Sequence, residues 1–193
     1  MNRDDLLDLF RRCSALLDGH FRLSSGLHSP GYLQCALVLQ HPRHAATLGE
    51  ALAEPLRELR PATVLSPALG GLIIGHEVAR ALGARAIFAE REDGVLRLRR
   101  GFTLTEAERV VVVEDVVTTG GSTRETMQVA RAAGAQVLAA AAVVDRSNGV
   151  SSLDVPLHVL MSLSLPTYEP AVCPLCAQGA PLTKPGSRQV AVR

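Results

Sequence analysis

Residues 110–123 read VVVVEDVVTTGGST. The four valines predict a strand that is buried on both faces, as in a parallel sheet covered by helices. Glu114 and Asp115 follow this strand, at the edge where open α/β sheets bind ligands. Residues 118–122 add hydroxyl groups, two glycines and successive backbone amides at the start of a helix, an arrangement that suits a phosphate group. The stretch therefore predicts a phosphate site beside two carboxylates that can accept hydrogen bonds from ribose hydroxyls.

Helical and strand patterns alternate around this stretch, which is typical of an α/β sheet. We expect a first helix over residues 4–18, a small strand pair within residues 21–40 and a second helix over residues 42–59. Helices are also expected over residues 71–82 and 121–133. Short apolar stretches predict strands at residues 62–66, 85–89, 109–114, 136–144 and 157–163. The pattern predicts a mainly parallel sheet flanked by helices.

The composition limits both the architecture and the partners of the chain. A chain of 193 residues with 47% apolar content can bury one good core and a small accessory lobe. Its 20 basic and 19 acidic side chains nearly cancel, so no overall field favours nucleic acid or a membrane as partner. No apolar stretch is long enough to span a bilayer, and residues 1–20 are charged rather than signal-like. We expect a cytoplasmic protein.

Residues 110–123 resemble the signature by which type I phosphoribosyltransferases hold phosphoribosyl pyrophosphate (PRPP). They match neither G-x-x-x-x-G-K-[ST] nor G-x-G-x-x-G, the patterns of other nucleotide sites. The resemblance implies an α/β fold with a small hood lobe. It also implies transfer of ribose 5-phosphate to a nitrogenous base, with Mg²⁺ bound through the substrate and pyrophosphate leaving.

A second loop, residues 67–71 with the sequence PALGG, resembles the pyrophosphate loop of the same family. Its glycine pair permits the tight backbone that such a loop needs. Alternatively, the glycines merely begin a helix. The implied PRPP-binding residues are Glu114, Asp115, Val116, Val117, Thr118, Thr119, Gly120, Gly121, Ser122, Ala68, Leu69 and Gly70.

Two further segments resemble those of orotate phosphoribosyltransferases. Residues 21–32 read FRLSSGLHSPGY, like the hood of that family, and residues 145–149 read DRSNG, like a strand end whose arginine meets the orotate carboxylate. The fork of Arg146 can pair with a carboxylate that adenine and hypoxanthine lack. Alternatively, Arg146 is a surface side chain or pairs with Asp145. The implied orotate-binding residues are Thr118, Arg146, Ser24, Ser25, Gly26 and Tyr32.

Residues 91–102 read REDGVLRLRRGF and occupy the place of the family's mobile catalytic loop. That loop is usually rich in lysine with a histidine, and the hood usually has a lysine where Ser24 stands, so this chain departs from the pattern. In this departure the chain resembles a bacterial subgroup of orotate phosphoribosyltransferases, the one found in Thermus-like organisms. The implied catalytic residues, which would stabilise negative charge growing on pyrophosphate, are Arg91, Arg97, Arg99 and Arg100. Alternatively, residues 95–100 form a hairpin strand with solvated arginines.

Related transferases cover the site of a neighbouring subunit with this loop, so we expect a homodimer. The resemblance divides the chain into an N-terminal hood segment at residues 1–40, a phosphoribosyltransferase core at residues 41–165 and an irregular C-terminal arm at residues 166–193. It implies an enzyme that makes orotidine 5′-monophosphate from orotate and PRPP in the synthesis of pyrimidine nucleotides. The alternatives are a purine-type phosphoribosyltransferase and a non-catalytic regulator that senses PRPP.

The sequence CPLC at residues 173–176 has the C-x-x-C spacing of half a zinc site. One such pair supplies only two of four tetrahedral ligands, so Cys13, Cys35 or a histidine would have to complete a zinc site. The six histidines show no ligand spacing among themselves. We therefore expect two ordinary thiols in a turn and no metal site built by the protein alone.

Overall fold

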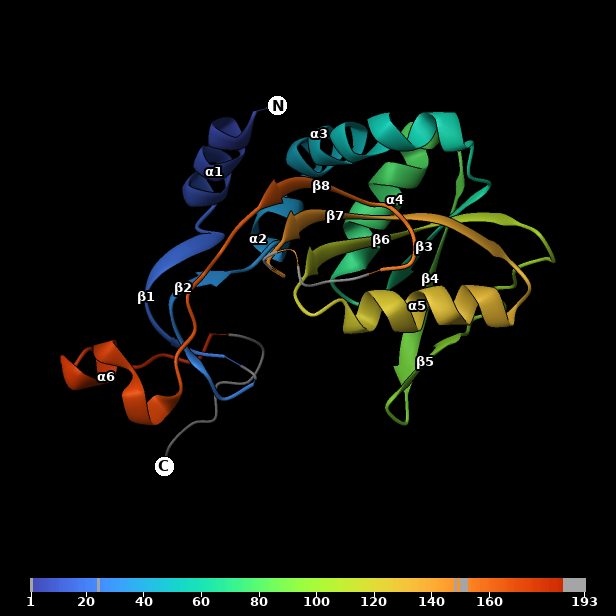
Figure 1. The fold of residues 1–193 in the computed structure, drawn as a ribbon. Coiled ribbons are helices and arrows are strands. Elements are labelled where there is room, and N and C mark those ends of the chain that lie inside the picture. Colours follow the sequence, from blue (N-terminus) through green and yellow to red (C-terminus); the bar gives the residue numbers. More distant parts are fainter. Residues whose placement is uncertain (1, 24, 148, 150–152, 186–193) are drawn as a thin grey trace.

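The computed structural model describes residues 2–23, 25–147, 149 and 153–185. Its helices and strands, in chain order, are α1 (Arg3–Arg12), β1 (Leu16–Arg22), β2 (His28–Leu33), α2 (Ala36–Leu39), α3 (Pro42–Ala53), η1 (Glu54–Leu59), β3 (Thr63–Pro67), α4 (Gly71–Leu82), β4 (Arg85–Glu92), β5 (Val95–Leu98), β6 (Arg109–Val117), α5 (Gly121–Ala132), β7 (Gln136–Asp145), β8 (Leu157–Ser162), η2 (Pro170–Val172) and α6 (Pro174–Ala177). Strands β1 and β2 form an antiparallel hairpin, and the other six form one sheet in the order β5-β4-β3-β6-β7-β8 (Figure 1). Within that sheet every neighbouring pair is parallel except β4 and β5, which confirms the predicted mainly parallel α/β sheet.

Helices cover both faces of the six-stranded sheet. Figure 1 shows α3 and α4 on one face and α5 on the other. The valines of β6 alternate between the two cores: Val111 and Val113 pack in the core that includes α3 and α4, and Val110 packs in the core that includes α5. All of these side chains are fully buried, as the valine run predicted. In the described part of the chain, no helix has the length and apolar character needed to cross a membrane.

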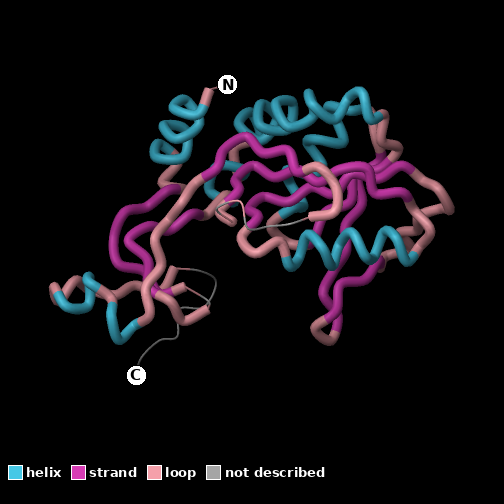
Figure 2. Tube along the Cα trace, in the orientation of Figure 1, coloured by secondary structure: helices cyan, strands magenta, loops and turns pink. Residues whose placement is uncertain are grey.

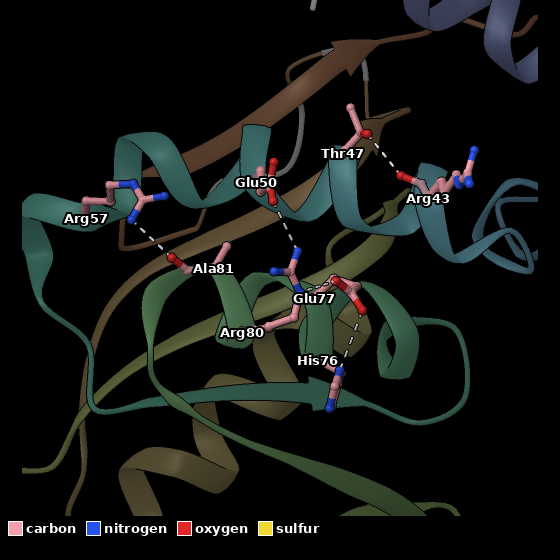
Figure 3. Close-up of polar contacts among 8 residues, drawn as sticks. All are labelled: Arg43, Thr47, Glu50, Arg57, His76, Glu77, Arg80 and Ala81. Carbon is pink, nitrogen blue, oxygen red and sulfur yellow. Dashed lines mark hydrogen bonds and ion pairs between the residues drawn. The ribbon is translucent and has the colours of Figure 1, made fainter.

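Helices α3 and α4 approach each other closely because Gly49 has no side chain. A Cβ atom at Gly49 would lie 2.6 Å from the Cβ atom of Glu77. The outer rim of this contact is polar, as Figure 3 shows: Arg80 donates to Glu77 at 2.7 Å and to Glu50 at 3.3 Å. These exposed pairs orient the two helices, whereas the buried apolar faces stabilise the contact.

The C-terminal arm lies beside the β1–β2 hairpin and consists mostly of loop (Figure 2). Thr183 forms an isolated β-bridge with Phe21 on β1, and Tyr168 forms one with His28 on β2. Two backbone hydrogen bonds of 2.9 and 2.8 Å join His28 and Tyr168. The arm therefore adds short stretches of backbone pairing to both strands of the hairpin, and the predicted irregular arm has a defined place in the fold.

Several predicted boundaries were wrong. The hairpin expected within residues 21–40 already begins at Leu16, and the strand expected at residues 85–89 continues to Glu92. The first helix does not reach residue 18 but ends at Arg12, because Ser14 adopts a positive φ of 52° and Leu16 already belongs to β1. Strand β6 does not end at Glu114 but continues to Val117, because β7 pairs with it as far as Asp145. The acidic pair therefore lies within the strand, held by the sheet rather than by a loop.

Glu108 joins the starts of three strands at the amino-terminal edge of the sheet. Its carboxylate accepts hydrogen bonds from the Thr63 hydroxyl at 2.6 Å, Arg85 at 2.7 Å and the Thr105 amide at 2.9 Å. Burial raises the pKa of Glu108, but these hydrogen bonds outweigh burial and lower the pKa to about 2. The charged carboxylate thus stabilises the edge from which β3, β4 and β6 begin.

We predict that Glu108→Gln lowers the free energy of unfolding at neutral pH by about 1–3 kcal/mol, because hydrogen bonds to a buried charge are lost. The folded pKa of Glu108 lies below its ordinary value of 4.5. The advantage of the wild type should therefore be complete above that value and shrink as the pH falls toward about 2. Urea unfolding across this pH range measures the difference. Glu106→Gln, at an exposed position of the same turn, is the control and should change little. A difference that stays constant with pH would contradict this role.

Candidate functional site

The candidate site lies at the carboxyl-terminal edge of the sheet. Strands β3, β6 and β7 are parallel neighbours, so the loops that follow them emerge at the same edge. These loops contain residues 68–70, residues 118–120 and Arg146. The sheet therefore brings together three segments that the sequence analysis selected separately.

Glu114 fixes the start of α5 to β6. Its side chain is only 9% exposed, and its two oxygens accept hydrogen bonds from the hydroxyls of Ser122 and Thr123, both at 2.7 Å. Burial raises the pKa of Glu114, the two hydroxyls lower it and the neighbouring Asp115 raises it again. In this structure Glu114 and Ser122 are thus engaged with each other, so the carboxylate orients the phosphate loop.

Asp115 lies against the β3–α4 turn. A Cβ atom at Gly70 would lie 2.5 Å from Asp115 Oδ1, so only glycine allows the turn to approach this closely. The same oxygen accepts a hydrogen bond from the Val116 amide at 2.9 Å. Burial raises the pKa of Asp115, and backbone hydrogen bonds lower it. This contact joins the predicted pyrophosphate loop to the predicted ribose-binding carboxylate.

The phosphate loop leads into α5 through a left-handed residue. Gly120 has a φ of 73°, a conformation that favours glycine, and α5 begins at the next residue. Arg124 donates to the Thr119 carbonyl at 2.9 Å and holds the loop against the first turn of the helix. Thr118 and Thr119 are exposed. The first amides of a helix have no partner within that helix, so this loop offers donors to an anion.

Arg146 follows β7 at the same edge and is half-buried. Its backbone amide donates to Val117 at 2.7 Å, which fixes it beside the phosphate loop. Burial lowers the pKa of Arg146, whereas negative charge on Tyr32 or Cys35 raises it. Within the described residues, its buried Nε atom has no hydrogen-bond partner and no ion pair joins it to Asp145. The sequence analysis did not select Cys35, which has no motif, although its thiol lies 3.9 Å from the Asp115 carbonyl.

Of the predicted hood residues, Ser25 and Gly26 lie at the tip of the β1–β2 hairpin, and Tyr32 lies on β2. Gly26 has a φ of 89° and donates to the Leu23 carbonyl at 3.0 Å, which closes the tip. Ser25 accepts a hydrogen bond from the Leu27 amide at 3.4 Å. Ser24 lies outside the described residues. The structure thus places Tyr32 on β2, whereas Ser25 and Gly26 are held in the hairpin tip by local hydrogen bonds.

The stretch at residues 91–102 forms the end of the β4–β5 hairpin, as in the alternative that we considered. Its arginines pair with glutamates: Arg91 with Glu125 at 2.8 Å, Arg100 with Glu90 at 2.7 Å, Arg99 with Glu92 at 3.3 Å and Arg97 with Glu92 at 4.0 Å. All four arginine side chains are well exposed, and Arg91 is the one tied to α5. A catalytic role for these arginines stays a prediction.

Comparison with known protein families identifies the class of enzyme to which this site belongs. Residues 36–161 match the phosphoribosyl transferase domain family, so the chain is a phosphoribosyltransferase. The match begins at α2 and ends within β8, so it contains the three loops of the candidate site and excludes the β1–β2 hairpin and the C-terminal arm.

Curated relatives narrow the class to one family. The chain is 49% identical to the orotate phosphoribosyltransferase of Desulforamulus reducens over 98% of its own length and all of that protein. It is 53% identical to that of Heliobacterium modesticaldum, covering 97% of this chain and 100% of the relative. A crystal structure of orotate phosphoribosyltransferase from Aeropyrum pernix superposes with a TM-score of 0.66 at 30% identity, covering 82% of this chain and 93% of that one. The chain belongs to the orotate phosphoribosyltransferases.

We predict that Gly70→Ala destabilises the ligand-free protein by about 1–3 kcal/mol, because the new methyl group overlaps the Asp115 carboxylate. In an Asp115→Ala background the same change should cost less, because the overlapping group is gone. Thermal unfolding of the four proteins measures this coupling. Gly121→Ala is the control, because its Cβ would meet only Thr119 Oγ1 at an ordinary 3.5 Å. Strictly additive effects of the two changes would refute the contact.

Proposed function

We propose that this chain transfers ribose 5-phosphate from PRPP to orotate and releases orotidine 5′-monophosphate and pyrophosphate. The observation that supports orotate as acceptor is Arg146, a half-buried cation at the sheet edge whose Nε atom lacks a partner among the described residues. Its fork can pair with the carboxylate of orotate. The relatives that align with nearly the whole chain are named for the same activity.

PRPP would bind across the two loops that Asp115 and Gly70 bring together. The amides and hydroxyls of residues 118–122 would hold the 5-phosphate, and the backbone of residues 68–70 would hold the pyrophosphate. Asp115 would accept hydrogen bonds from the ribose hydroxyls, with Glu114 behind it keeping the loop in place. Residues 116–117 contribute backbone between these contacts.

Mg²⁺ would be bound chiefly through PRPP. Both carboxylate oxygens of Glu114 already accept hydrogen bonds from hydroxyl groups. Among the described residues, the one cluster of three or more possible metal ligands lies away from this site. An ion that keeps substrate oxygens as ligands suits such a site, because Mg²⁺ favours phosphate oxygen and water. When bound, it supplies positive charge to the departing pyrophosphate.

The reaction breaks the bond between ribose C1 and pyrophosphate and forms a bond from C1 to a ring nitrogen of orotate, which gives up its proton to water or to the departing pyrophosphate. Arg146, with Thr118 and Tyr32 beside it, would hold the base in line with C1. Ser25 and Gly26, together with Ser24, would close over the base and exclude water, which would otherwise capture the positively charged ribose. The protein thus contributes mainly position and electrostatic stabilisation.

The arginines of the β4–β5 hairpin would exchange their glutamate partners for pyrophosphate. In this structure each of these arginines forms an ion pair with a glutamate, and such exposed pairs contribute little net energy. The arginines are Arg91, Arg97, Arg99 and Arg100, and their partners are Glu125, Glu92 and Glu90. A dianionic or trianionic group can therefore displace them. The hairpin projects from the edge of the sheet (Figure 1), and we propose that it reaches the site of a second subunit in a homodimer.

No observation favours the alternatives. Adenine phosphoribosyltransferase from Thermoanaerobacter pseudethanolicus superposes with a TM-score of 0.60 at 16% identity, covering 69% of this chain and 88% of that one, a likeness of fold alone. A regulator without catalysis would leave Arg146 unexplained. We also propose a cytoplasmic location, since both substrates are charged metabolites.

Orotate should be consumed in the presence of PRPP and Mg²⁺, whereas uracil, adenine and hypoxanthine should not. Arg146→Ala should cost about 2–5 kcal/mol of transition-state binding for orotate, because it removes the partner of a buried carboxylate. Steady-state kinetics with each base measure both effects. Arg131→Ala, an exposed arginine in the last turn of α5 and away from the phosphate loop, serves as the matched control for loss of an arginine. Equal turnover of uracil and orotate would refute the proposed acceptor.

A shared site can be tested with hybrid dimers. Subunits inactivated by Asp115→Asn and subunits with Arg97, Arg99 and Arg100 replaced by alanine are co-expressed with different tags, and the hybrid is purified. If the hairpin crosses to the neighbour, the hybrid regains one intact site, because both lesions fall in the other site. Each parental protein is melted as a control for folding. An inactive hybrid, or a fully active monomer, would remove the shared site.

A further inference from the structure

Four side chains that can bind a metal ion meet between the β1–β2 hairpin and the C-terminal arm. They are His20 on β1, His28 on β2, Cys173 before α6 and Cys176 within it, and their ligand atoms all lie within 4.8 Å of one another. The two halves of the cluster are far apart in the chain, since Cys173 and His20 are separated by 153 residues. The fold, rather than a sequence motif, supplies the second pair of ligands that the C-x-x-C lacked.

Four of the six separations between these atoms are close to the edges of a tetrahedron around zinc, and all six are within 4.8 Å. His20 Nε2 lies 3.0 Å from His28 Nδ1 and 3.5 Å from Cys173 Sγ. Cys176 Sγ lies 3.7 Å from His20 Nε2 and 3.3 Å from His28 Nδ1. Usual zinc–ligand bonds imply edges of about 3.3 Å between two nitrogens and about 3.6 Å between nitrogen and sulfur. An ion at the centre would therefore need only small shifts of the side chains.

The protein also orients the His20 ring for an ion. Its Nδ1 atom lies 2.9 Å from the carbonyl oxygen of Ala180, so this nitrogen carries the proton and donates it. The lone pair of Nε2 then faces His28 and the two sulfurs. A ligating histidine usually donates its other ring nitrogen to a carbonyl or carboxylate in this way. The contact sets both the tautomer and the ring orientation.

Burial and charge favour a divalent ion here. His20 and His28 are each 4% exposed and Cys173 is 3% exposed, so three of the four ligands are shielded from water. Two thiolates with two neutral imidazoles exactly offset a charge of +2, leaving a neutral site. Four protein ligands leave no position open for a substrate, which is the pattern of a structural zinc site.

We propose that His20, His28, Cys173 and Cys176 bind one zinc ion that clamps the C-terminal arm to the hairpin. The backbone already aligns these segments: His28 and Tyr168 exchange two hydrogen bonds, and the Thr183 amide donates to the His20 carbonyl at 2.9 Å. Each histidine thus lies in a stretch where arm and hairpin pair. The ion would add a cross-link between the arm and both strands of the hairpin.

The untagged full-length protein, produced with zinc in the medium, should contain one zinc ion per chain by elemental analysis. The thiols should resist alkylation until a chelator is added. Replacement of zinc by Co²⁺ should give thiolate charge-transfer absorption and the visible bands of a tetrahedral site. Protein that contains no zinc, that contains another metal in its place, or that has a Cys173–Cys176 disulfide would overturn the assignment.

The variants Cys173→Ser and Cys176→Ser should lose the ion, whereas Cys13→Ser should keep it, because Cys13 lies at the end of α1 outside the cluster. Chelation of the wild type should lower the melting temperature and speed proteolysis within residues 166–185, and added zinc should reverse both. If the serine variants fail to fold, the cobalt spectrum and chelation of the wild type still decide. Loss of zinc without any change in the arm would overturn the clamp.

Discussion

The parallel pairing of β3 with β6 is the constraint on which the candidate site depends. Thr63 pairs with Val110 and Leu65 with Val112, so the two strands end at the same edge and their loops face each other. That register sets the turn at Gly70 against Asp115, and it leaves Glu114 beneath the start of α5. The ligand groups are therefore positioned by strands and by a helix end, which hold geometry better than free loops.

The carboxylates at the two edges of the sheet have opposite environments. At the amino-terminal edge, Glu108 receives so many hydrogen bonds that its pKa falls to about 2. At the carboxyl-terminal edge, burial raises the pKa of both Glu114 and Asp115 above their ordinary values. The first edge stabilises the fold, whereas the second keeps charge where water solvates it poorly. Such placement is typical of a functional site, because a ligand can then improve the environment of the charge.

The central sheet and the phosphate loop could be predicted from the sequence, because valine runs and glycine-hydroxyl turns are local signals. The pairing of Ser122 and Thr123 with Glu114 could not, since no local pattern says that the first turn of α5 packs against the carboxylate of β6. The neighbourhood of Cys35 also has no local signal. The histidines that approach Cys173 and Cys176 were missed for a different reason: their spacing in the chain says nothing about a contact made across the whole sequence.

The place of the C-terminal arm has a consequence for the order in which the chain assembles. The β1–β2 hairpin is made well before its partners Tyr168, Cys173 and Thr183, and Cys173 follows His20 by 153 residues. Closing a loop of that length is slow compared with local contacts. The central sheet can fold while the arm is still being made, so the hairpin stays incomplete until the arm has been added. A nascent chain would therefore have its phosphate loop before it has a finished hood.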